Sequence, residues 1–182
     1  MKELSLNILD ISENSAKAKA TLIEIEIIET DNTLTLKISD NGIGMSKSTL
    51  ESVTNPFYTT RTTRSVGLGI PLLKLASEQT GGALTISSVE KTDDNAYHGT
   101  VVEALFYKNH IDFTPLGDCI ATLTTLIMGH PDIDFLFIHK KGENEVRLDT
   151  RELRSVLEDV PLDTYEVILW IKDNLTEQYN LI

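Results

Sequence analysis

Residues 34–44 read LTLKISDNGIG and combine an alternating strand pattern with a turn that carries a carboxylate. The apolar residues alternate with polar ones, which is the period of a half-buried strand. The strand delivers Asp40 to its end, and Gly42 and Gly44 then let the backbone turn tightly. A carboxylate held in this way can accept a hydrogen bond from an exocyclic amine, and the glycines let a flat ring approach the backbone. Because Asp-Asn-Gly is also typical of an ordinary turn, the flanking segments must decide between these interpretations.

The composition of the chain limits the classes of protein to consider. The 182 residues are 41% hydrophobic and 24% charged, which is typical of a soluble globular protein. We see neither a membrane-span pattern nor a signal-peptide core, so we expect a cytoplasmic protein without membrane partners. The single cysteine, Cys119, excludes an internal disulfide and a cysteine-based metal cluster. The net charge of −12 argues against nucleic-acid binding, and a polyanion site would need local lysines, arginines, backbone N–H groups and a metal ion.

Residues 3–19 have the apolar period of a helix. Asp10, Asn14 and Lys17 share another face of that helix, where they place an acid, an amide and an amine in one row. A solvated polar face is the alternative interpretation. Asn14 is a poor helix former in the middle of a helix, and the residues after it are small, which favours a site where something packs closely.

Four segments alternate as strands do. Residues 21–29 and 33–39 flank a short polar turn, so we expect an antiparallel hairpin there. Residues 83–89 and 99–107 are two further expected strands.

Residues 54–69 read TNPFYTTRTTRSVGLG and follow neither period. The segment is rich in hydroxyl groups, carries two arginines and ends in glycines directly before an expected helix at 70–80. Glycines that open a helix expose its first N–H groups, which favour phosphate. A cationic, hydroxyl-rich loop that leads into such a site is typical of a lid. Many such glycines are only helix caps, which is the alternative interpretation.

The composition changes around residues 108–115, where we place a boundary between a domain at 1–108 and a small α+β domain at 110–182. In the second domain we expect a helix at 115–129, a hairpin ending near Leu148 and two final helices. It contains no catalytic constellation that we can identify, and we interpret His130 and His139 as structural. Its role stays unknown.

In this order the motifs resemble the GHKL ATP-binding superfamily, which includes gyrase, a heat-shock chaperone, histidine kinases and MutL. The resemblance covers about residues 3–107 and is nearest to histidine-kinase catalytic domains and anti-sigma-factor kinases. NPFYTTR at 55–61 and GLGIPLLK at 67–74 look like the kinase F and G2 boxes. The resemblance implies an α+β fold, a two-layer α/β sandwich with a mostly antiparallel sheet.

The resemblance also implies a role for each matching residue. Asn14 would bind Mg²⁺ through its amide oxygen, since Mg²⁺ prefers oxygen ligands. Asp10 looks like the general base, and Lys17 would neutralise phosphate charge. Asp40 would accept from the adenine amino group, Gly42 and Gly44 would make room for the ring, and Thr100 would join that network. The residues implied to close over the triphosphate are Phe57, Thr60, Arg61, Arg64, Gly67, Leu68 and Gly69.

Three departures from the family pattern affect the expected function. Asp10 stands where the family usually has Glu, which puts hydrolysis in question. Ser65 stands where the G2 box usually begins with glycine. The chain begins at the first motif without a dimerisation helix pair or a phosphoacceptor histidine, so we do not expect a complete sensor kinase.

We therefore expect a histidine-kinase-like signal-transduction protein that binds ATP and Mg²⁺ and acts as a regulatory phosphotransferase on a separate partner protein. One alternative is a conformational switch that binds or hydrolyses ATP without kinase activity. Another is a scaffold. The sequence leaves a homodimer open.

Overall fold

The alternating segments form strands of one sheet, and the periodic segments form helices on it. The structure is a computed structural model that describes residues 3–53 and 69–182. The strands are β1 (Leu22–Glu29), β2 (Thr33–Asp40), β3 (Ala83–Val89), β4 (Gly99–Tyr107), β5 (Asp134–Lys141) and β6 (Asn144–Asp149). The helices are α1 (Leu4–Lys17), α2 (Lys47–Ser52), α3 (Gly69–Gln79), α4 (Cys119–Gly129), α5 (Thr150–Leu157) and α6 (Tyr165–Tyr179).

The six strands form one mixed sheet in the order β3-β4-β2-β1-β5-β6. Every neighbouring pair is antiparallel except β1 and β5, which run parallel. The expected hairpin is confirmed, with Ile25 opposite Ile38. The sheet is therefore mostly antiparallel, as the family resemblance implied.

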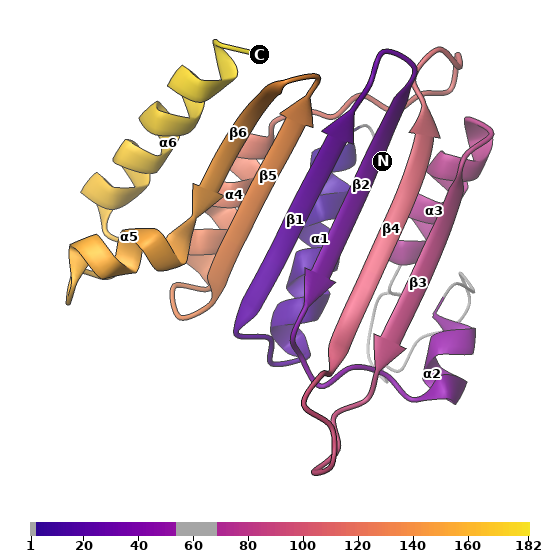
Figure 1. Ribbon diagram of the computed structural model, residues 1–182, viewed down its shortest axis with the longest axis horizontal. Helices are drawn as coiled ribbons and strands as arrows, with labels where there is room; N and C mark the ends of the chain where they lie inside the picture. The colour runs from indigo at the N-terminus through magenta and orange to yellow at the C-terminus, as the bar shows by residue number, and fades with distance from the viewer. Residues whose placement is uncertain (1–2, 54–68) are drawn as a thin grey trace.

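Helices α1, α3 and α4 cover one face of the sheet (Figure 1). Helix α1 lies in the middle of this layer and contacts both α3 and α4. Its residues Leu4, Ile8 and Ile11 are buried against the apolar residues of β1 and β2. This arrangement confirms the predicted two-layer α/β sandwich.

The second half of the chain differs from the expected separate unit, because its hairpin continues the same sheet. Strand β5 pairs with β1, and the apolar residues of both halves form one core cluster. The expected helix at 115–129 begins only at Cys119, because the carbonyl oxygens of Pro115 and Leu116 accept hydrogen bonds from the N–H groups of Leu4 and Ser5 at 2.9 and 2.8 Å. The predicted boundary therefore lies in a segment that caps α1, with no break in the packing.

The C-terminal helices close the β6 edge of the sheet. Asp149 caps α5 by accepting from the Arg151 N–H group. The side-chain amide of Gln178 on α6 accepts from the N–H group of Arg147 at 2.7 Å and donates to its carbonyl oxygen at 3.1 Å. Gln178 thus pairs with the edge strand as a neighbouring strand would. None of the described helices has the length and apolar character needed to cross a membrane.

Candidate functional site

The carboxylate of Asp40 is held at the end of β2 by two donors. The hydroxyl of Ser15 on α1 donates to Oδ2 at 2.7 Å, and the N–H group of Gly42 donates to Oδ1 at 2.9 Å. The side chain of Ser15 is buried, and Asp40 is half-buried. A carboxylate with fixed orientation and remaining lone pairs can accept from an amine on a ligand.

The turn after Asp40 requires glycine at two positions. A Cβ atom on Gly42 would lie 2.7 Å from the carbonyl oxygen of Ala18 and 3.0 Å from Oδ1 of Asp40. Gly44 has a φ of +67°, and a Cβ atom there would lie 2.0 Å from the carbonyl oxygen of Val89. Any side chain would push the turn away from the carboxylate.

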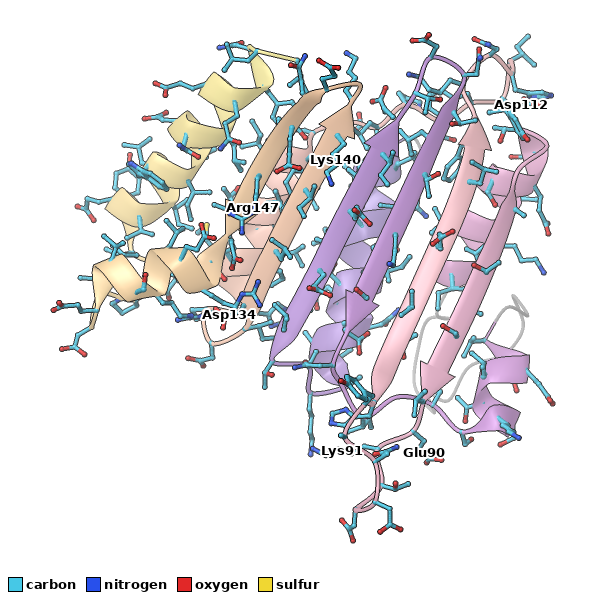
Figure 2. The ribbon with its side chains drawn as sticks, viewed as in Figure 1. Glu90, Lys91, Asp112, Asp134, Lys140 and Arg147 are labelled. Carbon is cyan, nitrogen blue, oxygen red and sulfur yellow. The ribbon has the colours of Figure 1, made fainter. Side chains whose placement is uncertain are left out.

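The neighbouring strand ends fix this turn. Thr100 pairs with Asp40 in the β2–β4 register, and its hydroxyl lies 2.9 Å from the hydroxyl of Ser88 on β3. Ser88 also accepts from the N–H group of Met45 at 2.8 Å. The N–H group of Lys91 donates to the carbonyl oxygen of Ile43 at 2.7 Å, and Lys91 lies just beyond the end of β3 (Figure 2). The loop after Asp40 is thus attached to the ends of two strands.

The polar face of α1 lies at the same end of the sheet. Asp10, Asn14 and Lys17 are all exposed. Lys17 forms an ion pair with Glu13 at 3.8 Å. A Cβ atom on Gly69 would lie 3.1 Å from Cβ of Asp10, so the first residue of α3 packs directly beside this carboxylate. The start of α3, whose first N–H groups have no partner within the helix, therefore lies beside Asp10 of α1.

The donor chemistry of this face fits a magnesium ion. The Asn14 amide oxygen and the Asp10 carboxylate are oxygen ligands one helical turn apart on an exposed surface. Mg²⁺ takes few protein ligands and completes its shell with water and phosphate oxygens. Asn14 would hold the ion, and a phosphate chain between α1 and the start of α3 would supply the other oxygens.

The structure brings Asp10, Asn14, Lys17, Asp40, Gly42, Gly44, Gly69 and Thr100 to one end of the sheet. The other predicted residues lie outside the described part of the chain. These are Phe57, Thr60, Arg61, Arg64, Gly67 and Leu68, together with the predicted lid that contains them.

Sequence reasoning missed three residues that build this site. Ser15 is buried, and its hydroxyl orients Asp40. Ser88 connects the turn to β3, and Nδ1 of His98 lies 2.6 Å from the carbonyl oxygen of Gly42. The position of Ser15 directly after Asn14 was a usable signal. Ser88 and His98 had none, because their contacts join segments far apart in the sequence.

Comparison with known proteins assigns residues 1–110 to the ATP-binding family that the sequence motifs resemble. The family model described as histidine kinase-, DNA gyrase B-, and HSP90-like ATPase matches residues 1–110. The sensor histidine kinase YvrG of Bacillus subtilis (strain 168) is 31% identical over 94 residues, which are 50% of this chain and 15% of that protein. The chain thus matches about one seventh of the length of its curated relatives, 14% and 15% in two cases.

Two solved structures share the fold. The Aquifex aeolicus MutL ATPase domain complexed with ADP matches with a TM-score of 0.55 and 16% identity, over 87% of this chain and 70% of that one. The N-terminal domain of a DNA repair protein matches with a TM-score of 0.58 and 17% identity, over 82% of this chain and 53% of that one. Both matches extend past residue 110, so the shared fold includes part of the second half.

Proposed function

The chain belongs to the histidine kinase-, DNA gyrase B- and HSP90-like ATPase family, and from this premise we propose that it uses Mg-ATP to phosphorylate a separate regulatory protein. The family assignment makes residues 1–110 an ATP-binding domain. The transfer to a protein, the magnesium site and the residue roles are the proposal.

The observation that carries the proposal is the fixed carboxylate of Asp40 at the end of β2, beside the polar face of α1. With one donor on each oxygen, Asp40 has a set orientation before any ligand arrives. An adenine amino group would donate to it without a cost for reorganisation. Thr100, opposite Asp40 in the sheet, would complete the polar contacts to the base.

The phosphates would extend from the adenine site towards α1 and the start of α3. Asn14 would hold the magnesium ion, Lys17 would neutralise phosphate charge, and the N–H groups at Gly69 would bind phosphate oxygens. Asp10 would accept the proton from the attacking hydroxyl or water. Phosphoryl transfer depends mainly on positioning and charge neutralisation, which these groups would supply.

The positions of the histidines support a separate acceptor protein. His98, His110, His130 and His139 are the four histidines of the chain. All four lie outside the helices of the described structure. His139 is buried, and His130 is 2.9 Å from Glu13. Because it is buried, His139 would not reach the γ-phosphate of an ATP bound at Asp40.

A switch without kinase activity is the second candidate. Its support is that α1, which carries the proposed phosphate contacts, packs on α4, so both halves share one helical layer. In such a switch, ATP binding would alter the packing of α4 and the helices after it.

Thermal unfolding with and without Mg-ATP tests the binding step, with wild type compared with Asp40→Ala. ATP at about 100 times its dissociation constant stabilises by about 2.7 kcal/mol, which is a rise in melting temperature of roughly 5–11 °C for a chain of this size. Asp31→Ala, in the exposed turn between β1 and β2, is the control and should keep the full shift. A shift that survives in Asp40→Ala would contradict the assigned adenine site.

Labelled ATP then separates the two candidates. Transfer of the γ-phosphoryl group to a co-purified partner, lost in Asp10→Asn, supports the phosphotransferase. Release of free phosphate without any labelled protein supports the switch.

A further inference from the structure

An apolar groove of about 600 Å³ lies between α5 and α6. Its volume is within the range of protein binding pockets. Its polar lining residues are Thr164 and Glu166. Its apolar lining residues are aliphatic except for one aromatic ring: Leu153, Val156, Leu157, Val160, Val167 and Trp170.

Several of these side chains are exposed to solvent. Val156 is 80% exposed and Trp170 is 51% exposed. Tyr165 and Leu169 on α6 are also exposed, and each is next in sequence to a residue that lines the groove. Adjacent exposed apolar side chains cost free energy in water, and such patches mark interaction sites.

The surroundings of the groove are acidic. Glu166 lines it directly, Glu158 and Asp159 lie in the chain between two lining residues, and Asp163 follows shortly after. All four are exposed.

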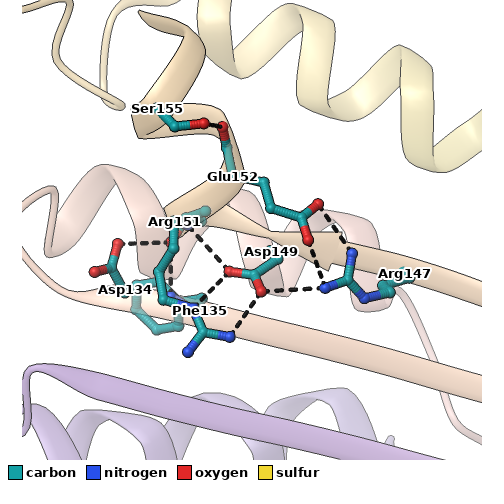
Figure 3. Close-up of polar contacts among 8 residues, drawn as sticks. Asp134, Phe135, Arg147, Asp149, Arg151, Glu152 and Ser155 are labelled. Carbon is teal, nitrogen blue, oxygen red and sulfur yellow. Dashed lines mark hydrogen bonds and ion pairs between the residues drawn. The ribbon is translucent and has the colours of Figure 1, made fainter. Parts of the chain in front are cut away.

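The nearby arginines are already paired in the described structure. Arg147 binds Glu152 at 2.8 Å and Arg151 binds Asp149 at 2.7 Å (Figure 3). Arg154 binds Asp134 at 2.7 Å. These ion pairs leave the carboxylates around the groove available to a basic partner.

We propose that this groove binds an amphipathic helix of a partner protein, with apolar side chains in the groove and lysines or arginines beside the acidic residues. Two helices that leave an apolar groove between them commonly accept a third amphipathic helix. A second copy of this chain fits poorly, because the acidic edges of two grooves would face each other and each chain carries a net charge of −12.

The groove lies at the β6 edge of the sheet, whereas α3 lies at the opposite edge and Asp40 lies at the end of the central strand β2 (Figure 1). A bound partner helix would therefore leave the ATP site accessible. This interaction surface is independent of whether the phosphoryl group goes to a protein or to water.

Fluorescence of Trp170 provides a direct measurement, since it is the only tryptophan of the chain and it lines the groove. The probe is a synthetic helical peptide with leucines at every third or fourth position and flanking lysines. The matched peptide has glutamates in place of those lysines. We expect a saturable blue shift with the lysine peptide, weakened by salt, and at least about tenfold weaker binding of the glutamate peptide.

Two variants test the location. Val156→Asp should abolish the shift, while Ile111→Asp, at a residue that is 95% exposed on a distant loop, should leave it unchanged. Glu166→Lys should reduce the preference for the lysine peptide, and this substitution leaves the apolar lining intact. Circular dichroism of each variant confirms that it is folded.

Three results would overturn the proposal. The first is equal binding of the two peptides or no saturable shift with the lysine peptide. The second is a sedimentation-detected dimer that Val156→Asp disrupts, because the groove would then bind a second copy. The third is a Trp170 shift with anionic lipid vesicles that is larger than the shift with the lysine peptide.

Discussion

The hydroxyl of Ser15 donates to Oδ2 of Asp40 across 2.7 Å, and this bond joins the end of α1 to the end of β2. Its two residues lie 25 positions apart in the sequence. Because Ser15 follows Asn14 directly, the residue next to the proposed metal-binding residue holds the proposed adenine-binding residue.

Ser15→Ala should weaken both folding and ATP binding. A hydrogen bond to a charged group contributes about 1.5–3 kcal/mol, and the Ala variant leaves Oδ2 of Asp40 without this donor. We therefore expect a loss of roughly 1–3 kcal/mol in the free energy of unfolding, measured by urea denaturation, and a weaker ATP affinity, measured by calorimetry.

Ser12→Ala is the matched control on the same helix. Ser12 is also buried, but its hydroxyl has no hydrogen-bond partner in the described structure. This variant should be as stable as wild type or more stable, and it should bind ATP normally. Equal losses in the two variants would mean that the Ser15–Asp40 bond contributes nothing specific.

Gly44→Ala should destabilise the turn after Asp40 more than Gly142→Ala destabilises the β5–β6 turn. The two glycines have similar φ values of +67° and +63°, so alanine carries a similar backbone cost of about 1–2 kcal/mol at each. Only Gly44 is crowded, with Val89 O at 2.0 Å from an added Cβ, whereas Gly142 has nothing within 4 Å. The crowding should add roughly 1–3 kcal/mol to the loss in unfolding free energy. Equal melting temperatures of the two variants would contradict the close approach to Val89.

Asp10→Asn should slow phosphoryl transfer while ATP still binds. The side chain is exposed, so we expect no loss of stability. Removal of a general base typically lowers the rate about 10²–10⁴-fold. Turnover is measured by phosphate release or partner labelling, and binding by the Mg-ATP thermal shift. A variant with the wild-type rate would exclude Asp10 as the base.

The free energy of unfolding should decrease as the pH falls below about 6.5 because of His139, and decrease further below about 4.5 because of Glu29. Burial lowers the pKa of His139 from its usual 6.5, although Glu29 acts to raise it; Lys108 and Lys141 add to the lowering. The hydroxyl of Tyr179 lies 3.1 Å from Nδ1. Burial acts to raise the pKa of Glu29, but its 2.6 Å contact with Lys108, together with other nearby cations, holds that pKa below 4.5.

The pKa values of His139 and Glu29 are both lower in the folded protein than in the unfolded chain. Both groups therefore bind protons more readily in the unfolded chain, and both make the protein less stable as the pH falls. The free energy of unfolding is therefore highest above pH 6.5 and decreases as His139 is forced to protonate. Urea denaturation across this range should show a smaller decrease for His139→Gln than for wild type. His110→Gln, an exposed residue, should keep the wild-type slope. Parallel curves for all three proteins would exclude His139 as the source.

The local pattern was enough to predict the strands and helices that surround Asp40. The alternation in residues 34–40 depends only on which side chains are apolar, so β2 and its hairpin with β1 follow from adjacent sequence. The same is true of the polar row Asp10, Asn14 and Lys17, because helical spacing places these residues on one face.

Local sequence patterns could not predict which side chains from distant segments of the chain reach the site. Ser88 and His98 reach the turn after Asp40 only because β3 and β4 pair beside β2. The groove between α5 and α6 likewise needs two helices at a particular separation, although the exposed valines and tryptophan are visible in the sequence.

The clearest example is the connection between the two halves of the chain. Residues 108–115 read as a linker, because their composition is polar and irregular and local preferences contain no information about which strand edge is free. Strand β1 pairs with β2 on one side only, which leaves its other edge free. Strand β5 pairs with that free edge in the parallel direction. An unpaired strand edge has unsatisfied N–H and C=O groups, so its pairing is decided by the assembled sheet. Local periodicity thus specified the elements and the acidic turn at Asp40, while the requirement to pair that edge and bury both halves in one core joined them into a single sheet.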